Sequence, residues 1–125
     1  MFYYLFNLIF ITPSIEWVIH YNMHKYNNQF HKDHHLEVHH EKTQIESYFI
    51  LIIYLFYLLD YKILTLGGIQ YLLNHSLIHF CPKYCNKEIL NHHLVHHMRP
   101  DYNFSVSNPY IDTLFDTRFI EKNNI

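Results

Sequence analysis

Histidine is the residue type that most clearly points to chemistry in this chain of 125 residues. It occupies 13 positions, and its neutral imidazole is the commonest metal ligand in proteins. Ten of these histidines fall into four blocks that use only two spacings. The blocks are His20 and His24; His31, His34 and His35; His75 and His79; and His93, His96 and His97. The pattern predicts a metal site built from imidazoles.

Both spacings place side chains on one face of an α-helix. The pairs follow the pattern i, i+4, and the triads follow i, i+3, i+4. Helical residues three or four apart have Cβ atoms roughly 5–6 Å from each other, so each block projects its imidazoles in one direction. A pair can hold one ion, and a triad can hold one ion and reach a second. Ten imidazoles can therefore serve two ions with about five ligands each, at the roughly 3.5–4 Å separation of two-metal sites.

Other interpretations of the histidines stay open at this point. A histidine-rich tract can bind metal without a defined site, although such tracts lack helical register. His39, His40 and His92 have no clear partner, so we expect them to be solvated or to support the ligands, and His35, His39 and His40 form a competing frame. All-imidazole sites suit iron, zinc, copper and nickel. The ion is thus either zinc, which hydrolyses or braces the fold, or a pair of irons that react with dioxygen.

Two apolar stretches must position these blocks. The first covers residues 1–12 and reaches the length of a membrane span only if it continues through residues 17–19. It lacks the charged start and the cleavage site of a signal peptide. The second stretch has two arms, 48–59 and 63–73, separated by the charged residues of 60–62. Charged residues are costly in lipid, so we expect a hairpin with a charged tip.

These features predict a single all-α domain over residues 1–125, with membrane-embedded helices and a cytosolic, histidine-rich, metal-binding cap. Basic residues gather in the polar segments on either side of the hairpin, and the positive-inside rule assigns that side to the cytosol. The formal charge of −2 argues against nucleic-acid binding, which needs a basic surface. The expected parts are an apolar helix at 1–19, histidine blocks at 20–40, a membrane hairpin at 44–74, histidine blocks at 75–97 and a C-terminal cap at 98–125.

The order of the blocks, with an apolar hairpin between the second and third, resembles the fatty acid hydroxylase/sterol desaturase superfamily of membrane di-iron enzymes. The likeness covers residues 16–117 and includes 103–104, Asp112 and 115–117. Acyl-lipid desaturases also carry histidine boxes, but typically with a longer gap than the one between the first pair and first triad here. In place of two glycines of the family, this chain has Ser105 and Asp116, and aspartate can adopt left-handed backbone angles at modest cost.

The resemblance implies a lipid-oxidising enzyme. It would use two irons, or zinc in the isolated protein, to hydroxylate a fatty acyl or sterol lipid with O2. Its electrons would come from NAD(P)H through a cytochrome-b-type or flavin reductase, in the endoplasmic reticulum or an equivalent host membrane. The alternative is a non-catalytic or zinc-holding membrane protein derived from this family. The implied ligands are His20, His24, His31, His34, His35, His75, His79, His93, His96 and His97.

The resemblance also suggests residues that support the ligands. Glu16, Asn103 and Asp112 are candidates for hydrogen bonds that fix the orientation of the imidazoles. For Asp112, a role as a helix cap is an equal alternative.

Overall fold

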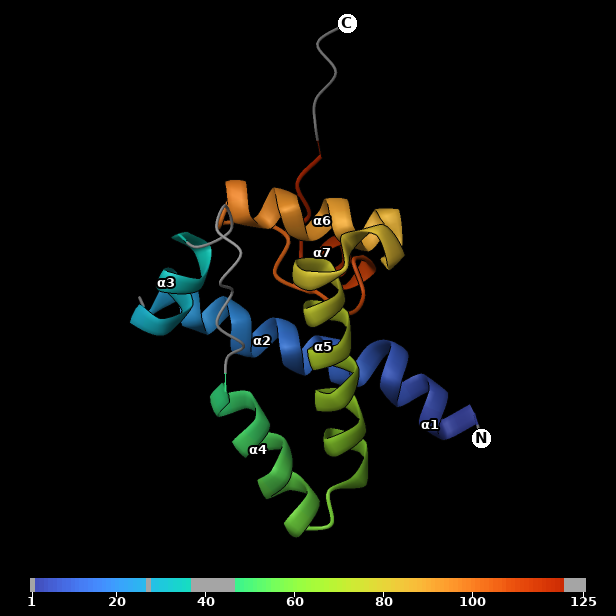
Figure 1. The fold of residues 1–125 in the computed structure, drawn as a ribbon. Coiled ribbons are helices and arrows are strands. Elements are labelled where there is room, and N and C mark those ends of the chain that lie inside the picture. The colour runs from blue at the N-terminus through green and yellow to red at the C-terminus, as the bar shows by residue number, and fades with distance from the viewer. Residues whose placement is uncertain (1, 27, 37–46, 121–125) are drawn as a thin grey trace, which may run out of the picture.

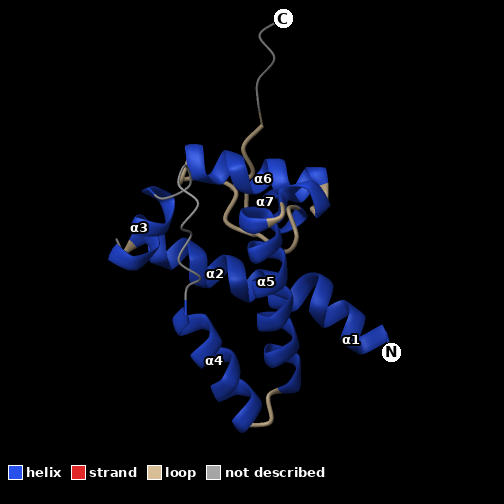
Figure 2. Cartoon of the chain, viewed as in Figure 1, coloured by secondary structure: helices blue, strands red, loops and turns tan. Residues whose placement is uncertain are grey.

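The computed structural model describes residues 2–26, 28–36 and 47–120, and all regular elements in these ranges are helical (Figures 1 and 2). The all-α prediction is confirmed for this part of the chain. His39 and His40, the competing frame that includes them, and the expected start of the hairpin at 44 lie outside the described residues. The elements are α1 (Phe2–Phe6), the π-helical η1 (Asn7–Ile11), α2 (Thr12–Lys25), α3 (Gln29–Leu36), α4 (Ser47–Leu58), α5 (Lys62–Phe80), the 3-10 turn η3 (Pro82–Tyr84), α6 (Lys87–Met98) and α7 (Tyr110–Leu114).

The first three elements follow one another without a break. Together they form a helical segment, Phe2–Lys25, which among the described residues is the one helix long and apolar enough to cross a membrane. The π-helical turn lies directly before Pro13, whose missing N–H and bulky ring disturb the regular hydrogen-bond ladder. The helix was expected to end near residue 19. It continues to Lys25 instead, and therefore carries the first histidine pair.

Helix α5 is the central element of the fold. It packs against α4, to which residues 59–61 join it, and α2 runs across it (Figure 1). Two glycines permit these close approaches, because a Cβ atom on Gly67 would lie 2.5 Å from Cβ of Thr12, and one on Gly68 would lie 2.5 Å from Cγ1 of Ile53. The connection between α4 and α5 bears the exposed ion pair of Asp60 and Lys62, with Oδ1 and Nζ 3.5 Å apart.

The C-terminal third closes over the end of α5. Asn86 caps α6 by accepting a hydrogen bond from the backbone N–H of Glu88 at 2.8 Å. After α6 the chain forms a loop, residues 99–109, then α7 and an extended segment (Figure 2). Few hydrophobic side chains are fully buried, and much of the interior next to α6 is polar. The buried polar residues include six histidines, together with Asn103, Ser105 and Asp112.

Candidate metal centre

The structure brings all ten predicted ligands into two groups of five. Within each group the candidate ligand nitrogens all lie within 4.8 Å of one another. The first group takes histidines from α2, α3 and α6, and the second takes them from α3, α5 and α6. The first histidine group is His20, His24, His31, His35 and His96, and the second histidine group is His34, His75, His79, His93 and His97.

The Nε2 atoms of the first group face one another. His31 Nε2 lies 2.8 Å from Nε2 of His20 and 2.8 Å from Nε2 of His24. His96 Nε2 lies 3.2 Å from Nε2 of His24 and 3.1 Å from Nε2 of His35. So many ring nitrogens cannot satisfy one another by hydrogen bonding, because a neutral imidazole has one donor and one acceptor. A cation at the centre of the ring of nitrogens would satisfy all five.

The second group repeats this arrangement. His75 Nε2 lies 3.1 Å from Nε2 of His34 and 3.1 Å from Nε2 of His79. His93 Nε2 lies 3.1 Å from Nε2 of His79 and 2.8 Å from Nε2 of His97. On the outer side of the group, the ring of Tyr71 stacks on His75 with ring centroids 5.3 Å apart. Two groups that can each hold a metal ion therefore lie side by side.

Burial favours the neutral form of several of these imidazoles, which is the form that binds metal. Desolvation by burial, followed by repulsion from neighbouring imidazoles, lowers the pKa of His35 to about 2. Burial also lowers the pKa of His96 to about 3, even though a hydrogen bond to the Tyr102 carbonyl opposes the shift. The pKa values of His93 and His97 are lowered for the same main reason. At neutral pH these four rings therefore carry free lone pairs.

The loop after α6 orients two ligands of the first group. His20 donates from Nδ1 to the carbonyl oxygen of Phe104, and His96 donates from Nδ1 to the carbonyl oxygen of Tyr102 at 2.6 Å. A proton on Nδ1 leaves the lone pair on Nε2, which in both rings points into the first group. Carbonyl contacts of this kind fix the tautomer and the ring orientation of metal-binding histidines.

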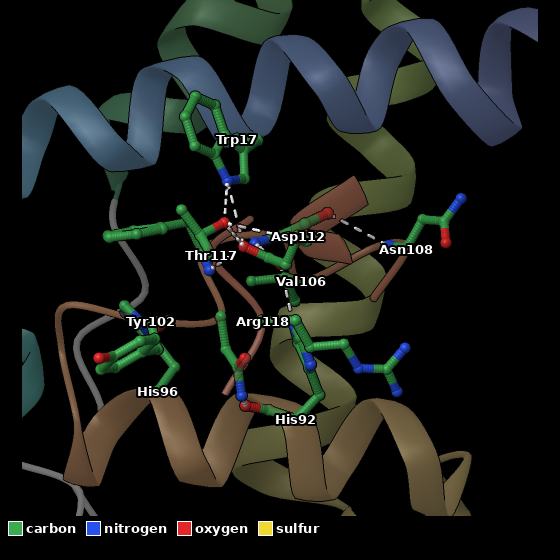
Figure 3. A network of polar contacts seen from close by, with 12 residues as sticks. Trp17, His92, His96, Tyr102, Val106, Asn108, Asp112, Thr117 and Arg118 are labelled. Carbon is green, nitrogen blue, oxygen red and sulfur yellow. Dashed lines mark hydrogen bonds and ion pairs between the residues drawn. The ribbon is translucent and has the colours of Figure 1, made fainter. Parts of the chain in front are cut away.

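Asp112 holds this loop in place (Figure 3). Its carboxylate is fully buried and accepts hydrogen bonds from the backbone N–H groups of Phe104 and Ser105, both at 2.8 Å. It also accepts from Thr117 Oγ1 at 2.7 Å. Because Asp112 lies in α7 and its backbone partners lie in the preceding loop, the carboxylate ties the loop to α7. The alternative that it caps a helix is therefore wrong.

His92 is also part of this network. Its Nε2 atom lies 2.9 Å from Asp112 Oδ2, and the side chain is 4% exposed. The expectation that His92 has no clear partner, and is either solvated or merely supporting, is thus corrected in part: the residue is buried and bound to Asp112. The sequence held no signal for this contact, because 20 residues separate the two.

The other two predicted supporting residues also anchor the loop, Glu16 by binding its backbone and Asn103 as part of it. The Glu16 carboxylate accepts hydrogen bonds from the backbone N–H groups of Val106 and Ser107. Asn103 accepts from the Phe119 N–H at 2.7 Å and donates to the His92 carbonyl at 3.1 Å. These contacts reach the first histidine group through the loop.

Two positions in this region adopt left-handed backbone angles. Asp116 has φ of 56°, so this aspartate adopts the left-handed conformation that was expected to be accessible to it at modest cost. Asn103, with φ of 60°, adopts it as well, whereas Ser105 does not.

Trp17 is a supporting residue that the sequence did not reveal. Its Nε1–H lies 3.1 Å from Asp112 Oδ1 and 2.9 Å from Thr117 Oγ1, and donates to both (Figure 3). The indole stacks on Phe115 with ring centroids 4.3 Å apart. Since Trp17 lies one turn before His20 on α2, it joins that helix to α7. Trp17 is the only tryptophan of the chain, which was the one available hint of a structural role. Its spacing from the histidines does not indicate a contact with Asp112.

Comparison of the chain with models of protein families, with curated proteins and with solved structures finds no match. The likeness to the hydroxylase superfamily therefore rests on the residues of this chain, and its functional implications are proposals. What stands independently is an all-helical arrangement in which two groups of five histidines can hold metal ions.

Proposed function

We propose that this chain is a membrane-bound di-iron oxygenase that hydroxylates an aliphatic lipid with O2. The observation that carries the proposal is the convergence of ten imidazoles in two groups of five. The block order described above, which resembles that of the hydroxylase superfamily, supplies the reaction type.

The number of imidazoles in each group supports ions with more than four ligands. Structural zinc sites are almost always tetrahedral with four ligands. Each group offers five imidazoles, one more than a structural zinc site uses, and this number favours iron.

Bound iron would supply the reduction of dioxygen and the oxidation of a C–H bond, while the protein supplies geometry and protection. In the overall reaction, O2, two electrons and two protons convert R–H into R–OH and water. The electrons would come from NAD(P)H through a cytochrome-b-type or flavin reductase. The C-terminal loop keeps Nε2 of His20 and His96 directed into the first group. Five of the ten candidate ligands are buried, which limits the access of bulk water to the proposed site.

A membrane location fits the distribution of exposed side chains. Large apolar residues are exposed along α1, α2 and α4, including Phe2 at 83% and Leu51 at 68%. Most charged side chains of the described residues lie on α3, on α6 and in the C-terminal region. We propose that α1–α2 and the α4–α5 hairpin enter the bilayer, and that the histidine groups face the cytosol at the endoplasmic reticulum or an equivalent membrane.

The test combines metal analysis with turnover. The purified chain, loaded with iron and given an electron donor, should contain two irons and convert an acyl or sterol lipid to a hydroxylated product only when O2 is present. The substitution His96→Gln removes one ligand and should lower the metal content and abolish turnover. Met98→Gln is the matched control, because it places the same residue on the same helix at a side chain 73% exposed and should change neither.

Two outcomes would contradict the proposal. If the chain purified from its natural membrane carries two zinc ions and the iron-loaded form gives no product from any acyl or sterol lipid, it is a metal-holding membrane protein. If His96→Gln retains full metal content and turnover, the ligand assignment is wrong.

A further inference from the structure

A cavity lies between α2, α4 and α5, the three helices that meet around Gly67 and Gly68. It has a volume of about 180 Å³ and a largely apolar wall. Met23 of α2, Ile52 of α4 and Phe56 of α4 contribute to that wall. His20, a member of the first histidine group, also lines the cavity. The cavity thus joins the proposed metal centre to the apolar part of the fold.

We propose that this cavity binds one unbranched alkyl segment of a membrane lipid, and that its substrate is an acyl chain rather than a sterol. This inference rests on the proposed function, since it names the substrate class for the same site. It is carried by the size of the cavity, the location of its mouth and the chemistry of its wall.

The size of the cavity selects a slender ligand. An apolar protein cavity of about 150 Å³ accommodates one benzene molecule, which has six carbons. By that scale, about 180 Å³ holds a stretch of roughly seven carbons. By the same scale the fused rings of a sterol, which contain about 17 carbons, need roughly 425 Å³, and ligand pockets for molecules of such size measure about 300–1,000 Å³. An alkyl chain needs only to thread its end into the cavity.

The mouth of the cavity opens on the apolar surface. Three of its wall residues are also exposed on the outside of the protein, Ile15 and Ile19 of α2 at 39% and 42%, and Ile52 of α4 at 38%. A chain can therefore enter between α2 and α4 directly from the lipid phase.

The wall favours an alkyl end over a headgroup. Apart from His20, Glu16 is the one acidic or basic residue in the lining, and its carboxylate already accepts hydrogen bonds from the backbone of Val106 and Ser107. A phosphate, amine or carboxylate headgroup would meet no free charged partner among the lining residues. The alkyl part of the lipid should therefore enter the cavity, and its carbons should come closest to His20.

The experiment uses photo-cross-linking of the full chain in phosphatidylcholine nanodiscs. The protein is loaded with zinc, so that labelling does not depend on turnover. One sample contains a phosphatidylcholine with a diazirine near the end of one acyl chain, and a second contains the same mole fraction of a diazirine-bearing cholesterol. Mass spectrometry then locates the adducts. Tyr54, which is 56% exposed on α4, reports contact with the surrounding lipid in both samples.

We expect the acyl probe to label Met23 and Phe56, and the sterol probe to label Tyr54 but neither of these two. The filling variant Ile52→Trp should reduce acyl adducts at Met23 and Phe56 by about tenfold or more, which corresponds to about 1.4 kcal/mol of lost binding. Leu51→Trp, at a neighbouring side chain that does not line the cavity, should leave them unchanged. Retention of two zinc ions shows that each variant is folded, and Phe56→Trp serves as a second filling variant.

Equal labelling of Met23 and Phe56 by the sterol probe would overturn the inference, and so would undiminished acyl labelling in a folded Ile52→Trp variant. The expected adducts together with an iron-loaded protein that produces no hydroxylated lipid would support the cavity assignment and count against the oxygenase proposal alone.

Discussion

Replacing Asp112 by asparagine tests whether the C-terminal loop holds the first histidine group. The fully buried carboxylate of Asp112 accepts hydrogen bonds from five donors. Its Oδ1 atom faces Trp17 Nε1, Phe104 N and Thr117 Oγ1, and its Oδ2 atom faces Ser105 N and His92 Nε2. Asparagine offers a single oxygen. In the better orientation its NH2 group replaces Oδ2, where His92 can change tautomer and accept, but the Ser105 N–H loses its acceptor.

The expected loss of stability follows from these contacts. One buried N–H without an acceptor costs about 1–3 kcal/mol. The three hydrogen bonds on the Oδ1 side change from charge-assisted to neutral, which roughly halves their strength. We therefore expect Asp112→Asn to reduce the free energy of unfolding by about 2–4 kcal/mol, a large share of the roughly 5–15 kcal/mol that a folded domain has.

The effect on metal binding should be confined to one group. The Tyr102 and Phe104 carbonyls orient His96 and His20 of the first group, and loss of such supporting contacts typically weakens metal binding about 10–100-fold. The assay is titration of metal-free protein with Co²⁺, read by its visible absorption, alongside thermal unfolding. We expect Asp112→Asn to weaken one of the two binding steps, while Asp101→Asn, at an exposed side chain, changes neither. Unchanged affinity for both ions, or equal losses at both in a folded variant, would refute the role given to the loop.

Three further predictions concern stability. His92→Gln removes the imidazole bound to Asp112 but no ligand, so it should lower the free energy of unfolding by about 1–3 kcal/mol and leave two ions bound at saturating metal. Asn91→Gln on the exposed side of α6 is the control, and wild-type stability of the His92→Gln variant would contradict the contact. The metal-free protein should lose stability as the pH falls from about 6.5 towards 3, because the pKa values of His35 and His96 are lowered to about 2 and about 3, so that the unfolded chain binds more protons in that window. Denaturant unfolding at pH 7 and pH 5 measures the loss in the free energy of unfolding, and no loss would mean that these rings are solvated. Removal of metal by a chelator should lower the unfolding temperature, since ions that bind the folded state stabilise it; an unchanged temperature would argue against bound metal.

The sequence was sufficient to identify the histidines that meet, because each block lies on one helix and helical periodicity is a local property. The same reasoning could not find His92. His92 and His96 are four residues apart, so spacing alone gives His92 the same claim to ligand status as His93. What separates them is the direction in which each ring points, and that depends on the contact of His92 with Asp112. Trp17 escaped notice for the same reason, since 95 residues separate it from Asp112.

The helical spacing also explains why the ten histidines divide into five and five. Each residue of an α-helix is rotated by about 100°, so position i+4 lies about 40° from position i, and position i+3 lies about 60° away on the other side. In the first triad His31 and His35 should therefore point one way and His34 another. The second triad should divide in the same manner, with His93 and His97 together and His96 apart.

The two groups follow this division. His34 leaves its triad to join the second group, and His96 leaves its triad to join the first. Each half of the chain thus contributes four imidazoles to one group and a single imidazole to the other. An isolated HxxxH pair would build separate sites, whereas the extra histidine at i+3 in each triad makes each group depend on both halves of the chain. The HxxHH spacing is therefore what makes the two candidate metal-binding groups depend on each other.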